Sequence, residues 1–156
     1  EEGIAEMEHA LAELAQVAVG IGAPGFLTLY AERLRRVGRH DDALRVVALG
    51  LMRAESQDSH WVDAELHRVH ARTLLDRGDA VEEAEARLLQ SLEIARQQEN
   101  NLFGLRTAMD IARLWQRRGK CDEARALLAP IHASFTEGFE LQDLQDAKAL
   151  VNELAR

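Results

Sequence analysis

Apolar residues recur along most of the chain at every third or fourth position, which is the spacing of one face of an α-helix. In the first such stretch Ile4, Met7, Leu11 and Leu14 follow this spacing. Polar or glycine-containing segments interrupt the pattern, so it predicts eight separate helices and an all-α protein. The expected helices cover residues 1–19, 26–37, 41–54, 61–77, 81–98, 102–118, 122–135 and 141–155. The residues expected to separate the first two helices are Gly20, Gly22, Pro24 and Gly25.

A short motif recurs between these predicted helices. It reads "RRVGRHDDALRVV" from residue 35, "DRGDAVEEAEARLL" from residue 76 and "RRGKCDEARALL" from residue 117. We expect its glycine to end one helix in the left-handed conformation, its acidic pair to lie in the first turn of the next helix, and its alanine to let two helices pack closely. The glycines are Gly38, Gly78 and Gly119, spaced by 40 and 41 residues, and the alanines are Ala43, Ala84 and Ala124.

A period of about 40 residues predicts an antiparallel helix-hairpin solenoid similar to a tetratricopeptide array. On that pattern a small residue at position 8 falls on Ala31, Ala71 and Ala112. We expect a single domain over 1–156, with a half repeat at 1–20, repeats at about 24–55, 61–99 and 102–137, and a C-terminal capping helix at 140–156. The half repeat and the absence of an initial methionine predict a fragment of a longer protein.

Composition narrows the class of protein. The formal net charge is −8, which argues against general nucleic-acid binding by bulk charge. A single cysteine cannot form an internal disulfide, and no apolar run is long enough to span a membrane. We therefore expect a cytoplasmic protein that contacts neither nucleic acid nor membrane.

Three kinds of functional site were considered, and the spacing of the residues argues against each of them. A phosphate-binding loop needs glycine five residues before the Gly-Lys pair and Ser or Thr after it, and these positions hold Leu114 and Cys121. Cys121 has no resolving partner, so we expect an inert, partly exposed thiol. His67 and His70 are three residues apart, whereas a helical zinc pair is usually four apart and needs a third ligand. We expect no metal and no cofactor.

Two segments carry a resemblance to a known family. "AELHRVHARTLLD" from residue 64 and especially "LAPIHASFTEGFELQDLQDAKAL" from residue 128 resemble the C-terminal tetratricopeptide-like region of large bacterial signalling proteins. Those proteins carry an N-terminal class III adenylate or guanylate cyclase, or a winged-helix DNA-binding domain, and a central signal-transduction NTPase. The resemblance covers nearly the whole chain and departs from relatives at His67, His70, Ala71 and Cys121. It implies that catalytic motifs belong to upstream domains, so this chain inherits neither activity.

The predicted inner face of the array is rich in arginine. In tetratricopeptide arrays, positions 2, 5, 9, 12 and 13 of each repeat point into the groove. Here they hold seven arginines against three acids, namely Arg35, Arg36, Arg68, Arg72, Arg106, Arg113 and Arg117 against Glu32, Glu65 and Asp76. Arginine suits bidentate contacts with carboxylates, so one hypothesis is a groove for an acidic segment. The alternative is that Arg68, Arg72 and Arg106 pair with Glu65, Glu32 and Asp110 and tie neighbouring repeats together.

These patterns favour a non-catalytic module for protein–protein interaction or signal input. Its expected partner is a protein or acidic peptide, including upstream domains of the same polypeptide, and self-association through exposed apolar surface is a further expectation. Two other functions stay open at this point. One is a free-standing adaptor, and the other is an enzyme, such as a hydrolase that uses His67 or His70 in the groove.

Overall fold

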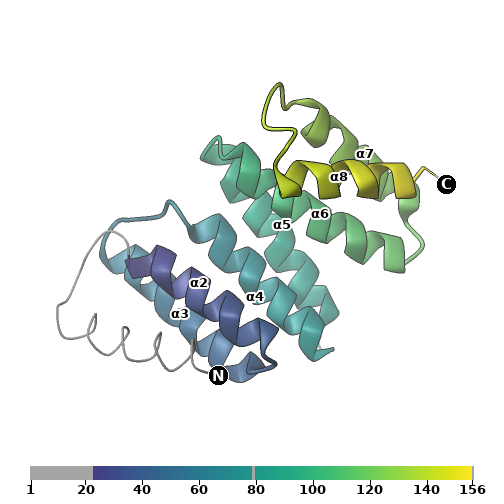
Figure 1. Ribbon diagram of the computed structural model, residues 1–156. Coiled ribbons are helices and arrows are strands. Elements are labelled where there is room, and N and C mark those ends of the chain that lie inside the picture. The colour runs from purple at the N-terminus through teal and green to yellow at the C-terminus, as the bar shows by residue number, and fades with distance from the viewer. Residues whose placement is uncertain (1–22, 79, 156) are drawn as a thin grey trace. The chain divides into compact units, whose positions relative to one another are not determined.

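The computed structural model describes residues 23–78 and 80–155, which fold into α-helices without any strand (Figure 1). The first predicted helix, 1–19, lies outside these residues. No helix in the described part of the chain is long and apolar enough to cross a membrane. The helices are α2 (Ala23–Arg36), α3 (His40–Ser56), α4 (Asp63–Arg77), α5 (Val81–Gln97), α6 (Asn101–Arg117), α7 (Cys121–Ala133) and α8 (Gln142–Glu153).

The chain forms two compact units, Glu1–Ala84 and Glu85–Arg156, and the boundary between them falls inside α5. In the first unit α2 packs against both α3 and α4, and α3 packs against α4. In the second unit α6 packs against α7, and α8 packs against both (Figure 1).

The three motif glycines adopt the predicted left-handed conformation. Their φ angles are +79° at Gly38, +80° at Gly78 and +75° at Gly119. The next helix in each case carries two acidic residues in its first turn, where they oppose the positive end of the helix dipole. The sequence motif therefore marks a real boundary between consecutive helices.

The alanines of the motif lie at the packing surfaces of the helices. In the first unit Ala43 is buried with Tyr30 and Leu34, and in the second unit Ala124 is buried with Ala112. The predicted position-8 residues Ala31, Ala71 and Ala112 are also fully buried. Small side chains at these positions let the backbones of packed helices approach closely.

The start of α2 differs from the prediction. Pro24 and Gly25 were expected to precede the helix, but both lie in its first turn. Proline fits there because its fixed φ is helical and its missing N–H would have no partner within the helix. A Cβ on Gly25 would lie 2.8 Å from Cη2 of Trp61, so glycine permits a close contact. Trp61 itself was expected in the fourth helix, yet it lies in the turn before α4, which begins at Asp63.

The C-terminal helices also end earlier than expected. Helix α7 ends at Ala133 and contains Pro130. Proline has no N–H, so the carbonyl of Ala126, four residues earlier, receives no α-helical hydrogen bond from it. Helix α8 buries Leu144, Ala147 and Leu150 against the second unit, as an amphipathic last helix should.

Candidate partner-binding face

The arginines predicted to line a groove lie on three helices. Arg35 and Arg36 lie on α2, and Arg68 and Arg72 on α4, all in the first unit; Arg106, Arg113 and Arg117 lie on α6 in the second. Six of the seven lie within 4.0 Å of a carboxylate oxygen of their own unit. Most of the predicted groove arginines therefore form ion pairs within their own unit.

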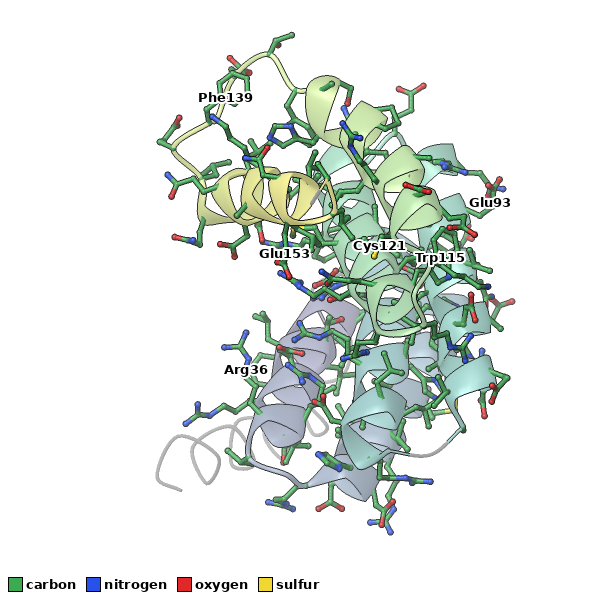
Figure 2. The ribbon with its side chains drawn as sticks, turned by 90° about the vertical axis from the view of Figure 1, so that its right-hand side faces the viewer. Arg36, Glu93, Trp115, Cys121, Phe139 and Glu153 are labelled. Atoms are coloured by element: carbon green, nitrogen blue, oxygen red, sulfur yellow. The ribbon has the colours of Figure 1, made fainter. Side chains whose placement is uncertain are left out.

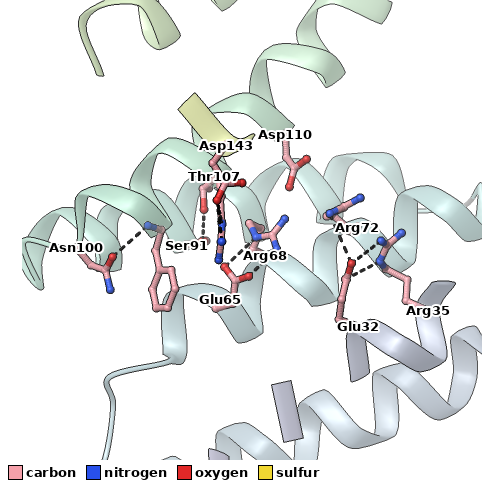
Figure 3. A network of polar contacts seen from close by, with 12 residues as sticks. Glu32, Arg35, Glu65, Arg68, Arg72, Ser91, Asn100, Thr107, Asp110 and Asp143 are labelled. Atoms are coloured by element: carbon pink, nitrogen blue, oxygen red, sulfur yellow. Dashed lines mark hydrogen bonds and ion pairs between the residues drawn. The ribbon is translucent and has the colours of Figure 1, made fainter. Parts of the chain in front are cut away.

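Glu32 is the centre of the cluster in the first unit (Figure 3). Its two carboxylate oxygens accept hydrogen bonds from Arg35 Nε and Nη2, each at 2.8 Å. Arg36 Nε donates to Oε1 at 2.8 Å, and Arg72 Nη1 lies 3.8 Å from the same oxygen. The i+3 and i+4 spacing from Glu32 to Arg35 and Arg36 places all three side chains on one face of α2.

Burial and the neighbouring arginines shift the pKa of Glu32 in opposite directions. Burial alone would raise its pKa, but hydrogen bonds from Arg35 and Arg36 and the charges of Arg35 and Arg72 outweigh it and lower the pKa to about 2. The hydrogen bond to Glu32 in turn raises the pKa of Arg35, against its own burial. The carboxylate of Glu32 therefore stays ionised and surrounded by donors.

Two further ion pairs involve arginines of the first unit. Arg35 also donates through Nη1 to Asp76 on α4, so it joins α2 to α4, and its side chain is only 7% exposed. Arg68 donates to both carboxylate oxygens of Glu65, at 2.6 and 2.9 Å, and both side chains are largely buried. The predicted pairs Arg68–Glu65 and Arg72–Glu32 are thus present.

In the second unit the pairing partly differs from the prediction. Arg106 was expected to pair with Asp110, and the structure shows it donating through Nε and Nη2 to Oδ2 of Asp143 on α8, at 2.9 and 2.7 Å, which was not predicted. Asp110 lies 3.5 Å from Arg113, at i+3 along α6. Gln116 donates to Glu153 at 2.8 Å, which makes a second polar link from α6 to α8.

A few guanidinium groups still face solvent. Arg36 is 64% exposed although it contacts Glu32, and it projects away from α2 (Figure 2). Arg113 is 45% exposed, and Arg117 at the end of α6 is exposed as well. In the first unit Arg36 is therefore the accessible arginine, whereas Arg35 and Arg68 are enclosed, and in the second unit Arg113 and Arg117 are accessible.

One polar cluster was not predicted. Trp115 donates from Nε1 to Oε1 of Glu85 at 2.6 Å, and Arg118 Nη1 contacts Oε2 of the same carboxylate at 2.6 Å. Glu85 is 30 residues from Trp115, and no local spacing rule connects them.

The histidines and the cysteine considered as functional residues lie on helices of the fold. His67 is buried on α4, and His70 is partly buried. Cys121 is a free, partly exposed thiol at the start of α7. Within residues 23–78 and 80–155 no group of three or more His, Cys, Asp and Glu side chains could hold a metal ion.

No protein-family model matches the chain, and no curated protein matches it.

Proposed function

We propose that this chain is a non-catalytic, tetratricopeptide-like array of helix hairpins that binds a protein partner. The observation that carries the proposal is the recurrence, at 40 and 41 residues, of a left-handed glycine, an acidic first turn and a buried alanine. Arrays of this kind stack one supersecondary unit repeatedly and use the resulting extended surface for binding. The resemblance noted above supports a place at the C-terminus of a bacterial multidomain signalling or transcription regulator, in the cytoplasm.

The chemistry of the charged face supports a binding role over catalysis. A general base needs a pKa near the working pH, and Glu32 has one near 2 because guanidinium groups surround it. We expect the purified chain to show no cyclase, nucleoside-triphosphatase or esterase turnover. Turnover that persists through purification and is lost on changing His67 or His70 to alanine would contradict this expectation and support the hydrolase alternative.

The partner we propose is an acidic segment, either of another protein or of upstream domains of the same polypeptide. Arg36 in the first unit and Arg113 and Arg117 in the second are exposed, and arginine forms paired hydrogen bonds with carboxylates. Arg72 lies 3.8 Å from Glu32 and is 31% exposed, so a ligand can reach its guanidinium group. The enclosed Arg35 joins α2 to α4 through Asp76, and the enclosed Arg68 pairs with Glu65 within α4.

The experiment measures binding of a fluorescent glutamate-rich peptide by anisotropy, at low and at raised salt. The double variant Arg36→Glu, Arg117→Glu should weaken binding about tenfold or more without a change in melting temperature, since exposed ion pairs contribute about 1 kcal/mol or less each. The matched control is Arg45→Glu, an exposed arginine on α3 that is not one of the seven predicted groove arginines.

A second double variant, Arg72→Glu with Arg113→Glu, separates binding from stability. Loss of peptide binding with the melting temperature retained supports the proposed face. A large loss of stability, with equal peptide affinity in the Arg36 and Arg117 variant and the Arg45 control, would show that the arginines serve only to hold the fold.

A further inference from the structure

The second unit contains a pocket that none of the seven predicted groove arginines lines. It has a volume of about 390 Å³ and lies between α5, α6 and α7. Its apolar lining includes Leu92 and Ala95 of α5, Gly104 of α6, and Leu127, Pro130 and Ile131 of α7. Sites that bind ligands are typically of this size, mostly apolar, with a few polar groups that fix orientation.

Gly104 leaves part of this pocket empty. A Cβ built on Gly104 would have one neighbour within 4 Å, the Cβ of Ala95 at 3.9 Å, which is an ordinary contact. Glycine in a helix interior costs about 1 kcal/mol relative to alanine. The chain therefore gives up stability in α6 at a position where an alanine would fit.

The other glycines that the structure describes each have a structural reason. Four have positive φ, and a Cβ on either of the other two would come within 3 Å of a neighbouring side chain. The four are Gly38, Gly78, Gly119 and Gly138, and the two are Gly25 and Gly50. Gly104 alone among them is explained by neither backbone nor packing, and a residue that breaks a local rule without structural need points to function.

The polar groups of the pocket lie at one end. Arg96 near the end of α5, Asn100 at the N-cap of α6 and Ser134 at the C-cap of α7 all line it. The side chain of Asn100 is engaged with the backbone N–H of Phe103 at 3.1 Å (Figure 3). Among the described residues no carboxylate forms an ion pair with Arg96, so the pocket combines an apolar trough with one available cation.

The shape of the pocket favours a polypeptide over a small molecule. Arg96, Ala126, Pro130 and Ser134 are exposed, so the trough is open along its length and would enclose little of a small ligand. From Ala126 to Ser134 it follows α7 for about 12 Å, which is roughly two turns of a docked helix. An amphipathic helix places its apolar side chains at this spacing.

We propose that this pocket docks an amphipathic helix of a partner protein, with its apolar face over Gly104 and an acidic residue at the Arg96 end. Leu92, Leu127 and Ile131 then contact the apolar side chains of the partner, and Arg96 pairs with its carboxylate. This surface lies on α5, α6 and α7 and includes none of the seven arginines of the other proposal, so either proposal can fail while the other holds.

The test uses the whole chain and synthetic helical peptides that carry leucines at positions i, i+3 and i+7 and glutamates at one end or the other. Matched peptides carry lysine in place of glutamate. Binding is followed by the NMR chemical shifts of Gly104, Ala126 and Ser134. We expect a glutamate peptide to bind with Kd below about 1 mM and its lysine counterpart to bind about tenfold more weakly.

Two variants and two controls decide the site. Gly104→Leu fills the trough and should abolish binding, whereas Gly104→Ala adds one methyl group to the trough and should weaken binding less. Arg96→Glu should reverse the preference to the lysine peptide, whereas Arg125→Glu, an exposed arginine of α7 outside the pocket, should not. Absence of shifts with every peptide, equal affinity for glutamate and lysine peptides, or unchanged binding in Gly104→Leu would each overturn the proposal.

Discussion

Single side chains with shifted pKa values make the first unit sensitive to pH, and Glu32 is the clearest case. Its pKa is lowered from 4.5 to about 2 in the folded chain. A lowered pKa stabilises the fold above the unfolded value, and this stabilisation is lost as the pH falls from about 4.5 toward 2.

Replacing Glu32 by Gln should remove this contribution. We expect a loss on the order of 1–3 kcal/mol at neutral pH, because the change leaves Arg35 enclosed without its main carboxylate partner. The loss should shrink as the pH is lowered toward 2. The measurement is urea unfolding at several pH values, with exposed Glu137→Gln as the control. Equal stability of the two variants at pH 7 would contradict the central role of Glu32.

His60 gives the opposite dependence on pH. It lies between α3 and α4, and its pKa is raised by the hydrogen bond from Nδ1 to Asp63 at 2.8 Å and by the charges of Asp63, Glu55 and Asp58. A raised pKa stabilises the fold below about 6.5, the unfolded value, and the effect is lost as the pH rises through the folded value. His60→Gln should therefore lower the melting temperature at pH 5 and leave it unchanged at pH 9. A shift of equal size at both pH values would contradict this.

At the scale of helices, the glycine hinges are the features that sequence alone could locate. Positive φ is strained for β-branched residues, so Gly78→Val or Gly119→Val should destabilise the chain by about 1 kcal/mol or more. Nothing lies within 4 Å of a Cβ at either position, so the loss would come from the backbone alone. Asparagine tolerates this conformation, so Gly78→Asn is the matched control and should lose less. Thermal unfolding that is unchanged in both valine variants would mean the hinge is wrongly assigned.

Two helical glycines should respond in opposite ways to alanine. Gly104→Ala should stabilise the chain by about 0.5–1 kcal/mol, because alanine has the higher helix propensity and its Cβ would meet no neighbouring atom closer than 3.9 Å. Gly50→Ala should destabilise it by about 1 kcal/mol or more, since its Cβ would lie 2.8 Å from Cδ2 of the buried Leu66. Differential scanning calorimetry measures both. Effects of the same sign would show that the packing around one of these glycines is misjudged.

The glycine hinges could be predicted from the sequence because glycine, an acidic pair and alanine follow one another at fixed offsets within a few residues. The pairs of Glu32 with Arg35 and of Glu65 with Arg68 have the helical i+3 spacing that sequence shows directly. By contrast, Asp143 meets Arg106 across 37 residues, and only tertiary packing brings them together. The pocket around Gly104 was missed for the same reason, although an unexplained glycine inside an apolar helical pattern was its one local sign.

At the scale of the whole molecule, the sequence predicted one repeat domain, and the described residues group into two compact units. The chain as a whole carries a formal charge of −8, and arginines on α2, α4 and α6 form ion pairs with carboxylates of the chain. The apolar face predicted for residues 1–19 lies outside the described residues, so self-association through it stays a prediction.

The two tryptophans offer a separate optical signal from each unit. Trp61 belongs to the first unit and is 49% exposed, whereas Trp115 belongs to the second, is partly buried, and donates to Glu85. In Trp115→Phe only Trp61 emits, and in Trp61→Phe only Trp115 emits, at a shorter wavelength because of its burial. If the fluorescence transitions of the two variants coincide along a urea gradient, the chain unfolds as one cooperative body; if they separate, each indole reports the unfolding of its own half.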